Sequence, residues 1–128
     1  MNENELAKIV VDAAFHVHTS LGPGLLESVY QKVMAYELNK RGLQVEEEVA
    51  VPVVWDDVQL EVGFRIDLLI DKKLVIELKS VEKVSPVHKK ILLTYLRLTD
   101  LKLGLLVNFG EELMKTGISR VVNGLKET

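Results

Sequence analysis

The sequence predicts a mixed α/β fold, with helices packed on a central β-sheet. Three observations favour it. Apolar residues recur every three or four positions near the N-terminus and again near residue 90, as in amphipathic helices. From Val45 the apolar period falls to two, as in half-buried strands. A mostly apolar run, Leu101 to Asn108, then suits a strand inside the sheet.

The N-terminal part is predicted to form a pair of helices. Residues 5–19 place apolar side chains at three- and four-residue spacing, and Gly22-Pro23-Gly24 ends this helix. A second helix is expected from about Leu25 to Arg41, with Gly42 as its C-terminal stop. Both helices precede the predicted sheet in the chain.

Three strands are predicted next. Val45 to Val53 alternates apolar residues with glutamates, and the run Glu46-Glu47-Glu48 is interpreted as strand with two solvent-facing acids. Leu60 to Ile70 and Leu74 to Ser80 are strand-like runs joined only by Asp71-Lys72-Lys73. Because the connection is so short, these two strands should form an antiparallel hairpin.

The last third of the chain is predicted to add a helix and two strands. Pro86 opens a helix that runs to about Leu98, with proline in the first turn, where its missing N–H does no harm. Leu101 to Asn108 is expected as a central strand and Ile118 to Asn123 as an edge strand. The order is ααβββαβ(α)β, in one domain of residues 1–128.

Composition excludes several classes of protein. The chain has no cysteine, which excludes disulfide frameworks, thiolate zinc sites and cysteine nucleophiles. No run approaches the ~20 apolar residues that span a bilayer, and the start MNENELAKIV differs from a signal peptide, so we expect a cytoplasmic protein without membrane contact. A net charge of -3 gives no basic footprint for nucleic acid. The 48% hydrophobic share leaves apolar surface for a homo-oligomer interface.

Two acids are predicted to meet on one face of the sheet. If residues 71–73 form a three-residue loop, Ile70 faces Leu74, and counting back along both strands puts Asp67 opposite Glu77. Directly opposed like charges destabilise a sheet. A hard cation such as Mg²⁺ binds through one or two carboxylates, waters and phosphate oxygens, and would turn this repulsion into coordination.

Lys79 adds a cation beside this pair, two residues beyond Glu77 on the same face. Its ammonium can hold a scissile phosphate or stabilise the charge that develops during hydrolysis. Metal, acid pair and cation are the parts required for phosphodiester hydrolysis by activated water. The same residues also fit a solvent-exposed strand face on which Glu77 pairs with Lys79, and the pattern alone does not choose between the two.

Two longer motifs carry a resemblance. Asp67, a hairpin and then Glu77-Leu78-Lys79 resemble the D…(D/E)XK signature of the PD-(D/E)XK nuclease superfamily. Gly24 to Tyr30, GLLESVY, is similar to the motif that names the GxxExxY protein family within it. Other matching segments lie along nearly the whole chain: Leu21 to Gly24, Pro86 to His88, Tyr95-Leu96 and Gly104 to Phe109.

This resemblance implies a restriction-endonuclease-like core and a metal-dependent nuclease acting on DNA or RNA, with Mg²⁺ or Mn²⁺ as its cofactor. Asp67 and Glu77 match the metal-ligating acids, and the Leu78 carbonyl is an expected further ligand. Glu27 matches the helix glutamate that points at the metal in many members. Lys79 matches the catalytic lysine.

Three further residues are candidates for contact with substrate. Tyr30 lies one helical turn after Glu27, where it can orient that residue, touch substrate or serve as a core aromatic. His88 and Tyr95 share one face of the third helix, although a lone helix histidine is more often structural.

Ile91 replaces a glutamine common in the family. An alternative is therefore a catalytically weakened or inactive module on the same fold, which binds nucleic acid or protein.

Overall fold

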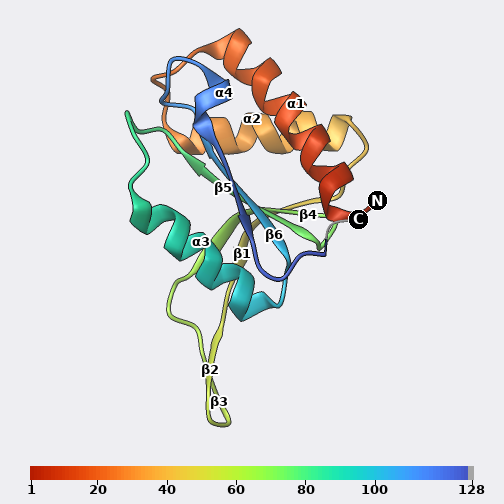
Figure 1. The fold of residues 1–128 in the computed structure, drawn as a ribbon, viewed down its shortest axis with the longest axis vertical. Helices are drawn as coiled ribbons and strands as arrows, with labels where there is room; N and C mark the ends of the chain where they lie inside the picture. Colours follow the sequence, from red (N-terminus) through yellow and green to blue (C-terminus); the bar gives the residue numbers. More distant parts are fainter. Residues whose placement is uncertain (127–128) are drawn as a thin grey trace.

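The computed structural model describes residues 1–126 and confirms the mixed α/β class. A five-stranded mixed sheet lies at the centre, with helices on both of its faces (Figure 1). The elements in chain order are α1 (Glu3–Leu21), α2 (Glu27–Lys40), β1 (Val45–Ala50), β2 (Val53–Trp55), β3 (Val58–Leu60), β4 (Arg65–Ile70), β5 (Leu74–Lys79), α3 (Pro86–Thr99), β6 (Leu103–Asn108), α4 (Met114–Gly117) and β7 (Ile118–Val122).

The strands of the main sheet follow the order β1-β4-β5-β6-β7. Only β5 and β6 run parallel among these neighbours, and α3 provides the crossover that a parallel pair needs. The pairs β1/β4, β4/β5 and β6/β7 are antiparallel. As a result, β5 and β6 occupy the interior of the sheet and end at the same edge.

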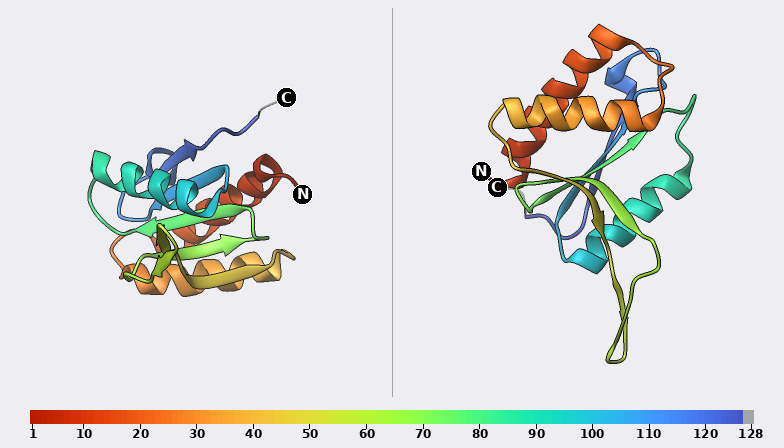
Figure 2. Two further views of the ribbon diagram at one scale, coloured as in Figure 1. Left: turned by 90° about the horizontal axis from the view of Figure 1, so that it is seen from below. Right: turned by 180° about the vertical axis from the view of Figure 1, so that it is seen from behind.

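The helices lie in two layers. One layer holds α1 and α2, and α3 covers the other face of the sheet (Figure 2). The apolar core is divided in the same way. The cluster of the α1/α2 face includes Leu6, Met34, Leu68, Ile76 and Leu105. The cluster of the α3 face includes Ile66, Val75, Leu92, Leu96 and Leu106. None of the helices in residues 1–126 combines the length and the apolar character needed to cross a bilayer.

The prediction of a single strand from Leu60 to Ile70 is wrong. Residues 61–64 lie outside any strand, and Gly63 adopts a left-handed φ of 86° there. The residues before this break belong to a separate two-stranded hairpin of β2 and β3, and β2 begins at Val53, where the first predicted strand was expected to end. This hairpin, residues 53–60, is called the arm below. It projects away from the rest of the molecule (Figure 1).

Candidate active site

The two predicted acids meet where β4 and β5 separate. The strands pair at Ile70–Leu74, Leu69–Val75 and Leu68–Ile76, and Asp67 and Glu77 follow directly. Beyond this point, hydrogen bonds between side chains and backbone amides replace the backbone–backbone hydrogen bonds that join the two strands. Glu77 Oε1 accepts a hydrogen bond from the Asp67 amide at 3.1 Å, and Asp67 Oδ2 accepts one from the Leu78 amide at 2.8 Å. Each carboxylate is thus fixed to the backbone of the facing strand.

Burial and mutual repulsion set the electrostatics of this pair. Glu77 is only 8% exposed. Its burial, followed by the charge of Asp67, raises the pKa of Glu77 to about 8. Burial also raises the pKa of Asp67, and the nearby charge of Lys79 opposes both shifts. Because the two carboxylates disfavour each other's ionisation, the pair tends to retain a proton near neutral pH unless a cation compensates it.

Glu48 is a third acid at this point, and the sequence analysis placed it only as part of a solvated run. β1 pairs with β4 at Glu47–Leu68 and Val49–Ile66, so Glu48 stands opposite Asp67 in register. Its own backbone leaves the regular ladder, with a left-handed φ of 53°. The charge of Glu48 contributes to the raised pKa of both Asp67 and Glu77. Glu48 could have been identified from the sequence by aligning β4 with β1 as well as with β5.

Glu27 lies at the first residue of α2, and its charge also raises the pKa of Asp67. The expected set of three ligating acids is nevertheless not assembled. Within residues 1–126, no three His, Cys, Asp or Glu side chains lie close enough together to hold one metal ion. The structure brings together Asp67 and Glu77 as a pair, with Leu78 tied to it through its amide.

The loop that leads into α2 is held against the end of β5. Ser80 Oγ donates a hydrogen bond to the Leu25 carbonyl at 2.6 Å. The Tyr30 hydroxyl donates to the Gly22 carbonyl at 2.5 Å and accepts from the Leu25 amide at 3.2 Å. Tyr30 is fully buried, and its ring stacks on Phe109 with centroids 4.3 Å apart. These contacts fit the core-aromatic interpretation, in which Tyr30 positions the loop before Glu27.

The candidates on α3 differ in their surroundings. His88 Nδ1 accepts a hydrogen bond from the Ser85 amide at 3.2 Å, which caps the start of the helix. Tyr95 is nearly buried, and burial followed by the charges of Glu77 and Asp67 raises its pKa, so its hydroxyl lies within their electrostatic reach. Ile91 is 41% exposed on the outer surface of the helix.

Asn108 is a residue of this region that the sequence analysis did not single out. It pairs in register with Lys79 across the parallel strands β5 and β6, and it is fully buried. Its carboxamide accepts from the amides of Val81 (3.1 Å) and Gly110 (3.0 Å) and donates to the Val81 carbonyl (2.9 Å). Asn108 thereby fixes the chain that leaves β5 after Lys79. The sequence did contain a signal for this role: Asn108 is a polar residue at the end of the otherwise apolar run of β6.

The donor set fits a hard cation. One oxygen of each acid accepts a backbone hydrogen bond, whereas Asp67 Oδ1 and Glu77 Oε2 accept no hydrogen bond from residues 1–126. Two carboxylates are the share of ligands that a protein commonly gives to Mg²⁺. Asp67 and Glu77 are therefore the residues that could hold such an ion.

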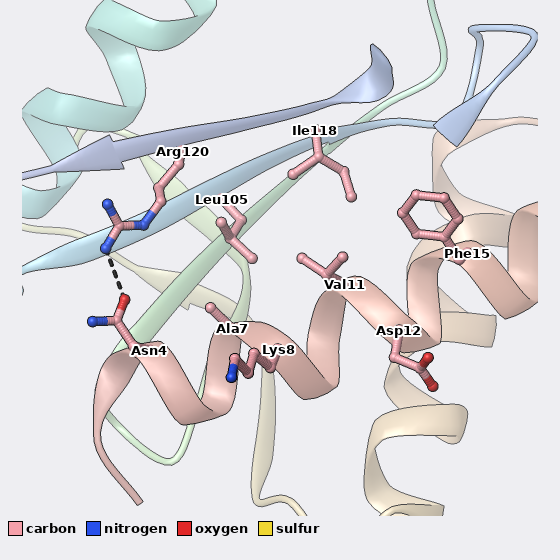
Figure 3. A pocket seen from close by; sticks show the side chains of 9 residues that line it. All are labelled: Asn4, Ala7, Lys8, Val11, Asp12, Phe15, Leu105, Ile118 and Arg120. Carbon is pink, nitrogen blue, oxygen red and sulfur yellow. Dashed lines mark hydrogen bonds between the residues drawn. The ribbon is translucent and has the colours of Figure 1, made fainter. Parts of the chain in front are cut away.

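A hollow of about 710 Å³ lies elsewhere, between α1 and the strands β6 and β7 (Figure 3). Val11 and Phe15 line it from the helix, and Leu105 and Ile118 line it from the sheet. Leu105 belongs to the core of the α1/α2 face, whereas Glu77 pairs with Leu106, which belongs to the α3 face. The hollow is therefore on the opposite side of the sheet from the acid pair and is not part of the candidate site.

Comparison with protein-family models gives one match, over residues 4–121, to the model described as the PD-(D/E)XK nuclease superfamily. The matched region contains β4, β5 and the whole acid pair. Neither the curated proteins nor the solved structures provide a significant match.

Proposed function

Because the chain belongs to the PD-(D/E)XK nuclease superfamily, we propose that it hydrolyses phosphodiester bonds of DNA or RNA with a divalent ion at Asp67 and Glu77. The observation that carries this proposal is the acid pair at the point where β4 and β5 separate. The charge of Asp67 adds to burial in raising the pKa of Glu77, and two carboxylates placed side by side destabilise the fold, which a purely structural role does not explain.

Mg²⁺ or Mn²⁺ is the proposed cofactor. When bound, such an ion lowers the pKa of a coordinated water and offsets the charge on the phosphate oxygens. The protein contributes prepared ligands: the hydrogen bonds from the amides of Asp67 and Leu78 hold both carboxylates in place before any ion arrives. The Leu78 carbonyl is the proposed additional direct ligand. Glu27, at the start of α2, does not lie close enough to share the ion directly and is proposed to bind it through a coordinated water.

Lys79 is the proposed catalytic cation. It follows Glu77 by two residues on β5, and its charge acts on both acids. An ammonium at this position can bind the scissile phosphate and stabilise the negative charge that grows on it. Asn108 positions the segment after Lys79 by bonding Val81. Membership of the GxxExxY family is part of the proposal, on the residues Gly24 to Tyr30.

The proposal predicts metal-dependent cleavage. Purified protein should cut labelled DNA or RNA, tested in single- and double-stranded form, when Mg²⁺ or Mn²⁺ is present, and EDTA should stop it. Asp67→Ala, Glu77→Ala and Lys79→Ala should each abolish cleavage, because each removes a metal ligand or the phosphate-binding cation. Gel electrophoresis of the products measures this.

Glu112→Gln is the matched control, because Glu112 is an exposed acid remote in sequence from the pair. It should retain full activity. Circular dichroism should show that all four variants are folded. Cleavage that persists in all three site variants would reject the assignment.

A second function is favoured by one observation. Ile91 presents an exposed apolar side chain on α3 where the resemblance implies a glutamine. A binding module that has lost hydrolysis would still bind nucleic acid, with an affinity that falls steeply as salt rises. Salt-dependent binding without cleavage at any divalent ion concentration would favour this second function.

A further inference from the structure

The arm has one apolar face that nothing in residues 1–126 covers. Its register pairs Val53 with Leu60 and Trp55 with Val58, so these four side chains share one face of the hairpin. Trp55 is 73% exposed, Val58 55% and Leu60 42%. A two-stranded hairpin alone in water is marginally stable and normally needs a helix or a further strand packed against it. The arm is therefore expected to have a partner surface.

The charges of the arm argue against nucleic acid as that partner. Asp56 and Asp57 form its turn, Glu61 follows it, and residues 51–64 contain no lysine or arginine. Such a segment is repelled by a phosphate backbone, which is bound through cationic side chains. A surface that is apolar and basic is complementary to it.

The outer face of α3 has these properties. Its exposed residues recur at helical spacing along the whole helix and are Val87, Lys90, Ile91, Thr94, Arg97 and Leu98. Three of them are large apolar residues, exposed by 52% (Val87), 41% (Ile91) and 38% (Leu98). No acid occurs between Pro86 and Thr99.

Four charged residues of the two surfaces also lack ion-pair partners in the part of the chain that the structure describes. Among residues 1–126, neither Lys90 nor Arg97 forms an ion pair, and the same is true of Asp56 and Asp57. The arm points away from the body of its own chain (Figures 1 and 2). Because Trp55 remains 73% exposed, the arm does not pack on its own α3. A second copy of the chain can offer α3 to it.

We propose that two copies of the chain form a dimer by exchanging arms. The apolar face of each arm packs on the outer face of α3 in the other copy, with Asp56 and Asp57 beside Lys90 and Arg97. A two-fold axis makes the two contacts equivalent, so both exposed surfaces are covered in one closed assembly. This dimer does not depend on nuclease activity.

The mass of the purified protein in solution tests this proposal first. Light scattering after size exclusion should give about twice the chain mass of 14.4 kDa. Trp55→Ser should give the single-chain mass, because it removes the largest apolar side chain of the contact. Tyr36→Ser is the matched control: Tyr36 is 72% exposed but lies on α2, so this variant should remain dimeric.

Charge reversal provides the sharper test. Asp56→Lys with Asp57→Lys should be monomeric, and so should Lys90→Glu with Arg97→Glu, since like charges then face each other in both contacts. Mixing the two double variants should restore a dimer, because each arm then meets an α3 of opposite charge. Circular dichroism checks that both remain folded.

Trp55 is the only tryptophan of the chain, so its fluorescence reports on the arm directly. Its emission should move to shorter wavelength as the protein concentration rises. The proposal is overturned by a wild type that stays monomeric across the dilution series, by a dimer that Trp55→Ser leaves intact, or by Trp55 emission that responds to added nucleic acid but not to protein concentration.

Discussion

At the scale of single residues, the electrostatics of the site depend on the protonation of Glu77, whose pKa differs between the folded and the unfolded chain. Glu77 has an ordinary pKa of 4.5 and a raised pKa of about 8 in the folded chain, through burial and the charge of Asp67. Between these two values the folded state binds more protons than the unfolded state. The contribution of Glu77 to stability is therefore present below pH 4.5 and is lost as pH rises towards about 8.

This difference predicts a pH dependence of stability in the absence of metal. Relative to Glu77→Gln, which cannot ionise, the wild type should lose free energy of unfolding steadily from pH 4.5 to about 8. Urea unfolding in EDTA at a series of pH values measures it. Glu112→Gln should follow the wild type throughout. A difference between wild type and Glu77→Gln that stays constant over this window would contradict the assignment.

At the scale of elements, the site depends on how the ends of β5 and β6 are held. Replacing Asn108 by alanine leaves the part-buried amide and carbonyl of Val81 without this partner. Asn108→Ala is expected to lower the free energy of unfolding by about 1–3 kcal/mol. Chemical denaturation measures the loss, and Asn39→Ala, at an exposed position of α2, should change it by less than about 0.5 kcal/mol. Equal effects of the two changes would show that Asn108 does not hold this loop.

The helices and the β4–β5 hairpin could be predicted from the sequence because periodicity and turn residues act locally. α3 begins at the predicted Pro86, and Ile70 faces Leu74 as counted. The acid pair follows from that register alone. The arm could not be predicted in the same way. Its residues continue the alternating apolar pattern of β1, and only the break at Gly63 separates it from β4.

Glu48 and Asn108 were missed for different physical reasons. The left-handed backbone of Glu48 does not follow from a run of three glutamates, and its place opposite Asp67 requires the pairing of β1 with β4. Asn108 acquires its role only when β6 is placed parallel to β5, a long-range choice that local pattern does not fix. Glu27, in contrast, was expected as a ligand only because of the family resemblance. Whether it reaches the metal depends on where α2 lies relative to the sheet, which local sequence patterns do not determine.

At the scale of the whole molecule, a net charge of -3 hides a separation of charges. Acids gather where β4 and β5 separate and at the tip of the arm, whereas α3 carries exposed cations and no acid. The first acid group suits a metal ion and the second suits the α3 of another copy. A bound metal ion would compensate the repulsion between the acids of the site. The α3 of a second copy would compensate the exposed acids of the arm.

Calorimetric titration with Mn²⁺ tests the central claim most directly. The wild type should bind Mn²⁺ at the acid pair, and Asp67→Asn and Glu77→Gln should each weaken that affinity at least about tenfold, which corresponds to ~1.4 kcal/mol. Glu112→Gln should bind as the wild type does. No binding by the wild type, or unchanged binding by both site variants, would contradict the account.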